Sequence, residues 1–68
     1  MSAETRRELL TALEELGNKY PEMRLGQLVL FVARLARGPA VSAVYDVDDE
    51  ELLREARSAL GEAALHRP

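Results

Sequence analysis

The sequence contains no cysteine and no tryptophan, and its only histidine, His66, lies two residues from the end. Without cysteine the chain cannot form disulfides, thiolate zinc sites or thiol redox centres. A lone histidine leaves few ligands for a transition metal, so we expect no metal and no cofactor. A 68-residue chain has only a small core, which such proteins commonly supplement with a partner subunit.

Long apolar runs are also missing. The longest extends from Leu28 to Ala33 and stops at Arg34, whereas a membrane span needs about 18–20 apolar residues. The first residues mix Glu4 and Glu8 with two arginines and have no apolar run behind them, unlike a secretory signal. We therefore expect no membrane contact and a cytoplasmic location.

Catalytic motifs are absent as well. The sequence has no GxGxxG segment, no phosphate-binding loop and no HExxH helix. Ser2, Ser42 and Ser58 have no acid and base at a recognisable spacing. We therefore predict that the protein is not an enzyme.

Three segments of helical periodicity are present, and they predict an all-α, three-helix domain spanning residues 1–68. We place the helices at about residues 3–16, 22–37 and 49–64, with a frayed tail at 65–68. Ser2 is the expected start of the first helix, and Gly17 with Asn18 is its expected stop. Gly38 and Pro39 are expected to end the second helix.

The second predicted helix is apolar almost all round, so we expect it to be the central one. A second interpretation is that Leu30 and Phe31, bordered by Gln27, Arg34 and Arg37, form a surface for self-association or for a partner. The two interpretations are compatible in part. The residues expected to form the core side of this helix are Leu25, Leu28, Val29, Val32, Leu35 and Ala36.

Residues 38–47 are predicted to be a loop that Val44 and Tyr45 pack over the core. Asp48 is the expected N-cap of the third helix, with Glu51 completing a capping box. The acidic run that they belong to is assigned mainly to helix capping, and a docking patch for a basic partner is the alternative. Its members are Asp46, Asp48, Asp49, Glu50 and Glu51.

Two segments resemble a family of small uncharacterised bacterial and phage proteins. The first is the Pro21-x-x-Arg24-Leu-Gly-Gln-Leu block, and the second runs from Tyr45 through Val47 and the acidic residues to Leu53. Val44 and Asp46 depart from the residues usual beside the aromatic. The resemblance covers about a third of the chain and implies no activity. We hypothesise that Arg24 or Gln27 bonds the loop or the start of the third helix, with Gly26 allowing close approach.

The function predicted from the sequence is a non-catalytic protein-interaction module, either a homo-oligomer or the small partner of a larger bacterial protein. The predicted partner-binding residues are Gln27, Leu30, Phe31, Arg34 and Arg37. The alternative is a small DNA-associated regulator with a helix-turn-helix-like arrangement, which would use Arg24, Arg34 and Arg37. The net charge of -3 disfavours nucleic acid as a partner.

Overall fold

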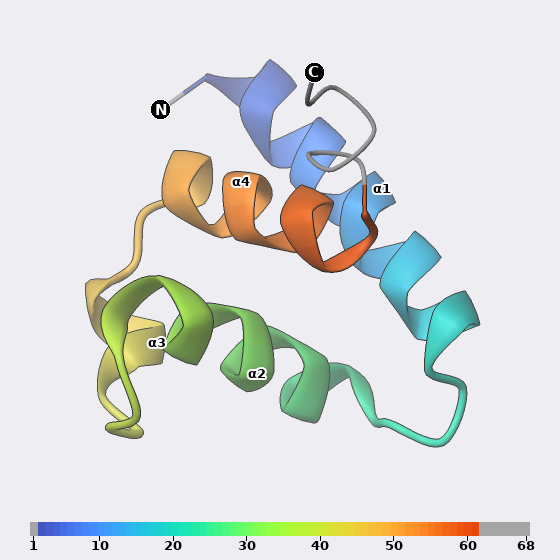
Figure 1. The fold of residues 1–68 in the computed structure, drawn as a ribbon. Helices are drawn as coiled ribbons and strands as arrows, with labels where there is room; N and C mark the ends of the chain where they lie inside the picture. The colour runs from blue at the N-terminus through green and yellow to red at the C-terminus, as the bar shows by residue number, and fades with distance from the viewer. Residues whose placement is uncertain (1, 62–68) are drawn as a thin grey trace, which may run out of the picture.

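The computed structural model describes residues 2–61, which form the helices α1 (Ala3–Lys19), α2 (Leu25–Arg37), α3 (Ala43–Asp46) and α4 (Asp49–Ala59). The all-α class is confirmed, and no strand occurs within residues 2–61. Helix α4 lies against both α1 and α2, while the one-turn α3 packs on α2 (Figure 1). Helices α1 and α2 also contact each other, so the three longer helices pack mutually and α2 is not enclosed between the other two as expected.

Two helix starts follow the expected capping chemistry. Ser2 Oγ accepts a hydrogen bond of 3.0 Å from the backbone N–H of Thr5, so it caps α1. Asp48 Oδ1 accepts from the N–H of Glu51 at 2.8 Å, and Glu51 Oε1 accepts in return from the N–H of Asp48 at 3.1 Å. These bonds satisfy N–H groups that have no partner inside the helix. Both predicted starts are confirmed.

Helix α1 continues through Gly17 and Asn18, so the predicted stop at these residues is wrong. The helix ends at Lys19, because the ring of Pro21 restricts the preceding residue, Tyr20, to non-helical backbone. The following turn is tied by a 3.0 Å bond from the N–H of Met23 to the carbonyl of Tyr20. Consequently α2 begins at Leu25, three residues later than predicted.

The core lies where α1, α2 and α4 meet. Leu16, Val32 and Ala56 have no exposed surface, and apolar burial of this kind is the main source of stability. Leu25 and Leu35, both predicted to be core, are instead 64% and 50% exposed. The buried apolar residues are Leu9, Ala12, Leu13, Leu16, Leu28, Val32, Ala33, Ala43, Leu52, Leu53 and Ala56.

The predicted 38–47 loop contains α3, which the sequence pattern did not indicate. Ala43 is the buried residue of α3, whereas Tyr45 is 85% exposed and Val44 is also exposed. The prediction that Val44 and Tyr45 pack over the core is therefore wrong, because a single helical turn can direct only one side toward α2 and its smallest side chain takes that side. Gly38 ends α2 with a φ of 95°, a conformation that favours glycine.

Helix α4 ends at Ala59, with Gly61 at a φ of 89° just beyond it. This end is earlier than the predicted residue 64, and glycine at this position is a common way for a helix to stop. Lys19 Nζ donates a 3.0 Å hydrogen bond to the carbonyl of Ala59, which links the end of α1 to the end of α4. Residues 62–64 of the predicted helix and the predicted frayed tail lie outside the described residues.

Candidate functional site

Most of the predicted partner-binding residues lie on the side of α2 that faces away from Leu28 and Val32, and Phe31 lies at the edge of that side, about 60° from Leu28. At 100° per residue, Gln27, Leu30 and Arg34 fall on one side of the helix, with Leu28 and Val32 on the other. Gln27, Phe31, Arg34 and Arg37 are exposed, and Leu30 is half-buried. The structure thus brings the predicted residues to one surface, although it does not give all of them the same surroundings.

Phe31 is an exposed aromatic side chain whose position is fixed by a neighbour. Its ring lies 6.5 Å from the ring of Tyr20, centroid to centroid, with 70° between the planes. This edge-to-face arrangement is favourable for aromatic pairs. The Tyr20 ring is itself contacted by Lys19, whose Nζ lies 5.6 Å from the ring centroid. Phe31 is therefore 37% exposed while one side of its ring packs against Tyr20.

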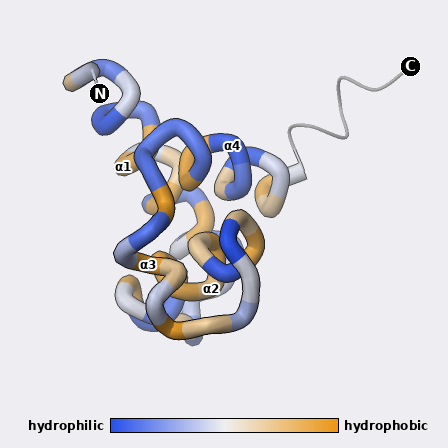
Figure 2. Tube along the Cα trace, turned by 90° about the vertical axis from the view of Figure 1, so that its left-hand side faces the viewer, coloured by the Kyte–Doolittle hydropathy of each residue, from blue (hydrophilic) through white to orange (hydrophobic). Residues whose placement is uncertain are grey.

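Leu35 belongs to the same surface, although its place in the apolar stripe made it look like a core residue. It lies one helical turn after Phe31, so the two side chains are neighbours on the helix surface. We call the surface formed by Gln27, Leu30, Phe31, Arg34 and Leu35 the α2 outer face. In Figure 2 the tube of α2 contains orange, apolar stretches, whereas the beginning of α4 is blue.

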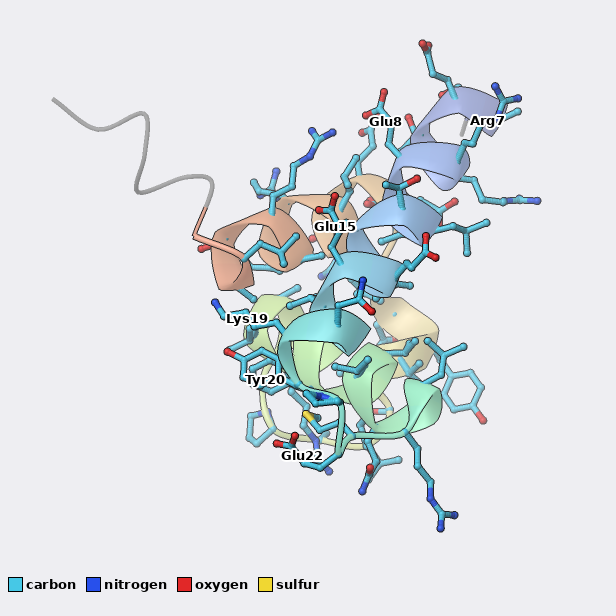
Figure 3. All side chains as sticks on the ribbon, turned by 90° about the vertical axis from the view of Figure 1, so that its right-hand side faces the viewer. Arg7, Glu8, Glu15, Lys19, Tyr20 and Glu22 are labelled. Atoms are coloured by element: carbon cyan, nitrogen blue, oxygen red, sulfur yellow. The ribbon has the colours of Figure 1, made fainter. Side chains whose placement is uncertain are left out.

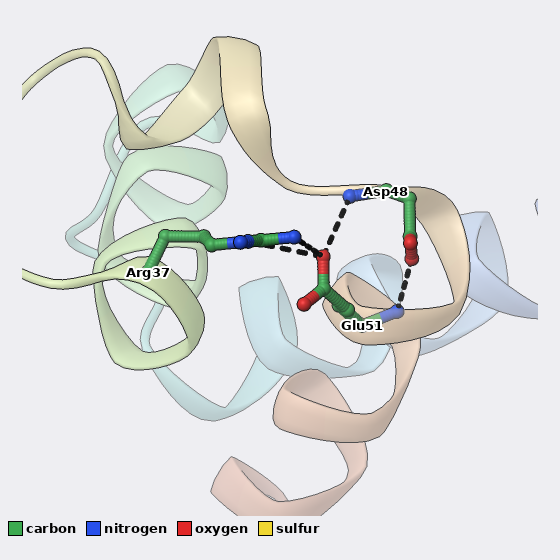
Figure 4. Close-up of polar contacts among 3 residues, drawn as sticks. All are labelled: Arg37, Asp48 and Glu51. Atoms are coloured by element: carbon green, nitrogen blue, oxygen red, sulfur yellow. Dashed lines mark hydrogen bonds and ion pairs between the residues drawn. The ribbon is translucent and has the colours of Figure 1, made fainter.

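Arg37 differs from the other predicted residues because it binds within the molecule (Figure 4). Its Nη2 and Nε donate to Glu51 Oε1 at 2.8 Å and 3.1 Å. The same oxygen also accepts the Asp48 N–H, so one carboxylate holds the end of α2 against the start of α4. We therefore leave Arg37 out of the α2 outer face and assign it to fold maintenance.

This network shifts both ionisation equilibria toward the charged forms. The hydrogen bond from the Asp48 N–H, followed by that from Arg37, lowers the pKa of Glu51 below its ordinary value. The hydrogen bond with Glu51 and its negative charge raise the pKa of Arg37. Each shift has the sign expected for an ionised group that is stabilised by its bonded partner.

The hypothesis about Arg24, Gln27 and Gly26 is corrected by these contacts. Gln27 Oε1 accepts a 2.8 Å bond from the N–H of Arg24, so Gln27 caps its own helix. No atom lies within 4 Å of the position that a Cβ on Gly26 would occupy, so the backbone makes no close approach there. The side chain that reaches the start of α4 is that of Arg37, which the reasoning from the two sequence blocks did not include.

Charge is distributed unevenly along the sequence. Residues 23–45, which include α2, contain three arginines and no acidic residue, whereas the rest of the sequence holds all twelve acidic residues and six basic ones. Ion pairs in the described part of the chain join Arg6 to Asp49, Arg37 to Glu51 and Arg57 to Glu8. None of these pairs includes Arg24 or Arg34, so the positive charges beside the α2 outer face are not neutralised by a bonded carboxylate.

A second surface feature is a pocket of about 240 Å³ between α1 and α4. Glu8, Thr11, Ala12, Glu15 and Arg57 line it, and Figure 3 shows Glu8 and Glu15 projecting from α1. Arg57 already binds Glu8 at 3.1 Å, and the polar lining residues are exposed. The residues between 2 and 61 include no group of three acidic or histidine side chains arranged to hold a metal ion. We place no site in this pocket.

Comparison with models of protein families, with curated proteins and with solved structures found no match to this chain. The resemblance to small bacterial and phage proteins stays a prediction. Across residues 2–61, none of the helices combines the length and the apolar character that crossing a membrane requires.

Proposed function

We propose that this chain is a non-catalytic protein-interaction module that binds its partner through the α2 outer face. The observation that carries the proposal is the exposure of Phe31 and Leu35, 37% and 50%, on an ordered helix beside Arg34. Exposed apolar residues with arginine at their edge are characteristic of protein–protein contact surfaces. Aromatic and arginine side chains also contribute strongly to binding energy in such surfaces.

The support of Phe31 by Tyr20 strengthens this proposal. A side chain that is already held in position loses less conformational freedom when a partner covers it. The chain also gains from association, because its small core has no disulfide to reinforce it.

A selection experiment tests the proposed function without assuming the identity of the partner. A random peptide library is selected on the immobilised protein, and the enriched peptides are then bound to three forms of the chain. Leu35→Glu alters the α2 outer face, and Leu10→Glu is the matched control because Leu10 is 59% exposed on α1. We expect the peptides to bind wild type and Leu10→Glu, and to lose at least about tenfold in affinity on Leu35→Glu.

Circular dichroism of each variant shows whether it keeps the helical fold. Equal binding to folded Leu35→Glu and to wild type would refute the proposal, as would a selection that enriches no peptide.

The DNA-associated alternative is weakened by the engagement of Arg37. Of the three arginines that it would use, Arg37 is already bonded to Glu51, while Arg24 and Arg34 lie ten residues apart. Ten residues correspond to about 15 Å along a helix. Duplex binding needs a basic stripe, and two isolated charges separated by apolar side chains do not form one.

A further inference from the structure

We infer that the partner of the α2 outer face is an acidic amphipathic helix of a different protein. This inference rests on the proposed function and adds the chemistry of the occupant. Arg24 and Arg34 form no ion pair with any carboxylate in the described part of the chain, and no acidic residue occurs between residues 23 and 45. A partner with carboxylates at matching positions would form an ion pair with each arginine.

The shape of the surface favours a helix as the occupant. The exposed apolar residues Phe31 and Leu35 lie one turn apart on α2, which is 13 residues long. Side chains at this spacing form a ridge that packs into the groove of a second helix. An extended peptide would need the free edge of a sheet, and the described residues contain no strand.

The spacing of the two arginines sets a requirement on the partner. They lie about 15 Å apart along the helix axis, so the partner helix needs two carboxylates separated by a similar distance on the borders of its apolar stripe. A third carboxylate near Arg37 would gain little, because that guanidinium is already bonded to Glu51.

A second copy of the chain fits this surface less well. In a two-fold symmetric dimer each patch meets the same patch of the other copy. Arg34 would then lie near the arginines of the second copy, and residues 23–45 contain no acidic residue that could neutralise them. If the α2 outer face instead met the acidic side of α1 in another copy, the contact would be head-to-tail and would give a ring or a filament rather than a symmetric dimer.

Two designed peptides of roughly 18 residues test the inference. Both carry the same leucine stripe at helical spacing, but one has glutamate and the other lysine on the borders of the stripe. The net charge of -3 on the chain would attract the lysine peptide if only overall charge mattered. A preference for the glutamate peptide therefore reports the local field of the α2 outer face.

Binding is measured by titrating each peptide into ¹⁵N-labelled protein to about 1 mM and recording amide chemical shifts. We expect the glutamate peptide to bind at least about tenfold more tightly than the lysine peptide, with the shifts centred on α2. Arg34→Glu should reverse this preference. Arg54→Glu on α4 is the matched control and should leave it unchanged, because Arg54 is also exposed but lies on a different helix.

The possible outcomes separate the inference from the proposed function. Peptides that bind the α2 outer face without a preference for glutamate would overturn the inference and leave the proposed function standing. Concentration-dependent dimerisation that Leu35→Glu abolishes would do the same, since the occupant would then be a second copy. Retention of duplex DNA that Arg34→Glu abolishes would overturn both, as would the absence of any α2 shift with either peptide in a monomeric protein.

Discussion

Replacement of Gly17 by alanine should stabilise the protein. Gly17 lies within α1, and its backbone is helical rather than left-handed. Alanine in a helix is more favourable than glycine by about 0.5–1 kcal/mol, chiefly because glycine loses more backbone freedom on folding. The position is two residues from the end of α1, where fraying reduces this gain toward the lower value.

The added methyl group also makes a contact. Its carbon would lie 3.7 Å from Leu28 Cδ1, which is an ordinary van der Waals distance. Removing a methyl group from water contributes up to about 0.8 kcal/mol, so the two effects together give about 1 kcal/mol. For a domain of this size, that corresponds to a rise in Tm of roughly 4–8 °C.

Thermal unfolding followed by circular dichroism measures this rise. Gly26→Ala is the matched control, because Gly26 is also helical but has no atom within 4 Å of the added carbon. Its stabilisation should be the smaller of the two. An unchanged or lowered Tm for Gly17→Ala would refute the reasoning, since it would mean that Gly17 adopts the glycine-specific conformation of a helix end.

Three further predictions concern caps and turns. Gly38→Ala should destabilise the fold by about 1–3 kcal/mol, because the φ of 95° is unfavourable for alanine, and a urea midpoint no lower than that of wild type would contradict this. Ser2→Ala should cost about 1 kcal/mol by removing the cap on the N–H of Thr5; faster exchange of that amide is the measurement, and unchanged exchange would argue against the cap. The folded pKa of Glu51 lies below its ordinary 4.5, so its contribution to stability is present above that pH and is lost as the pH falls through the folded pKa. Between about pH 7 and about pH 3, the Tm of Glu51→Gln should therefore fall less than the Tm of wild type; an identical fall in both proteins would show that the Glu51 network contributes nothing.

Local chemistry in the sequence was sufficient to predict the starts of α1 and α4. Ser2 and the Asp48–Glu51 capping box depend only on residues three positions apart, and the structure contains both. The stop at Gly17 was predicted on similar grounds but was wrong, because a helix can accommodate glycine at a modest cost. The later signal, Pro21, acts by steric exclusion and is therefore the stronger one.

Contacts between helices were harder to predict. Leu25 and Leu35 share an apolar stripe with Leu28 and Val32, and periodicity alone does not show how much of α2 the other helices cover. The neighbouring helices cover only the middle of that stripe, and Leu25 and Leu35 at its two ends remain exposed. The pairing of Arg37 with Glu51 joins residues that are 14 positions apart, so no helical spacing reveals it. The α2 outer face keeps Gln27, Leu30, Phe31 and Arg34 from the predicted set, and its binding role stays a prediction.

The bond between Arg37 and Glu51 closes the chain segment that lies between them. Lengthening a closed loop costs little, about 0.6 kcal/mol for each doubling of its length. Residues 39–42 are exposed and lie between Gly38 and the buried Ala43. Residues inserted at this point would lengthen a loop whose two ends are already joined by the Arg37–Glu51 hydrogen bonds. A tag or an extra segment can therefore be inserted there while α2 and α4 keep their positions.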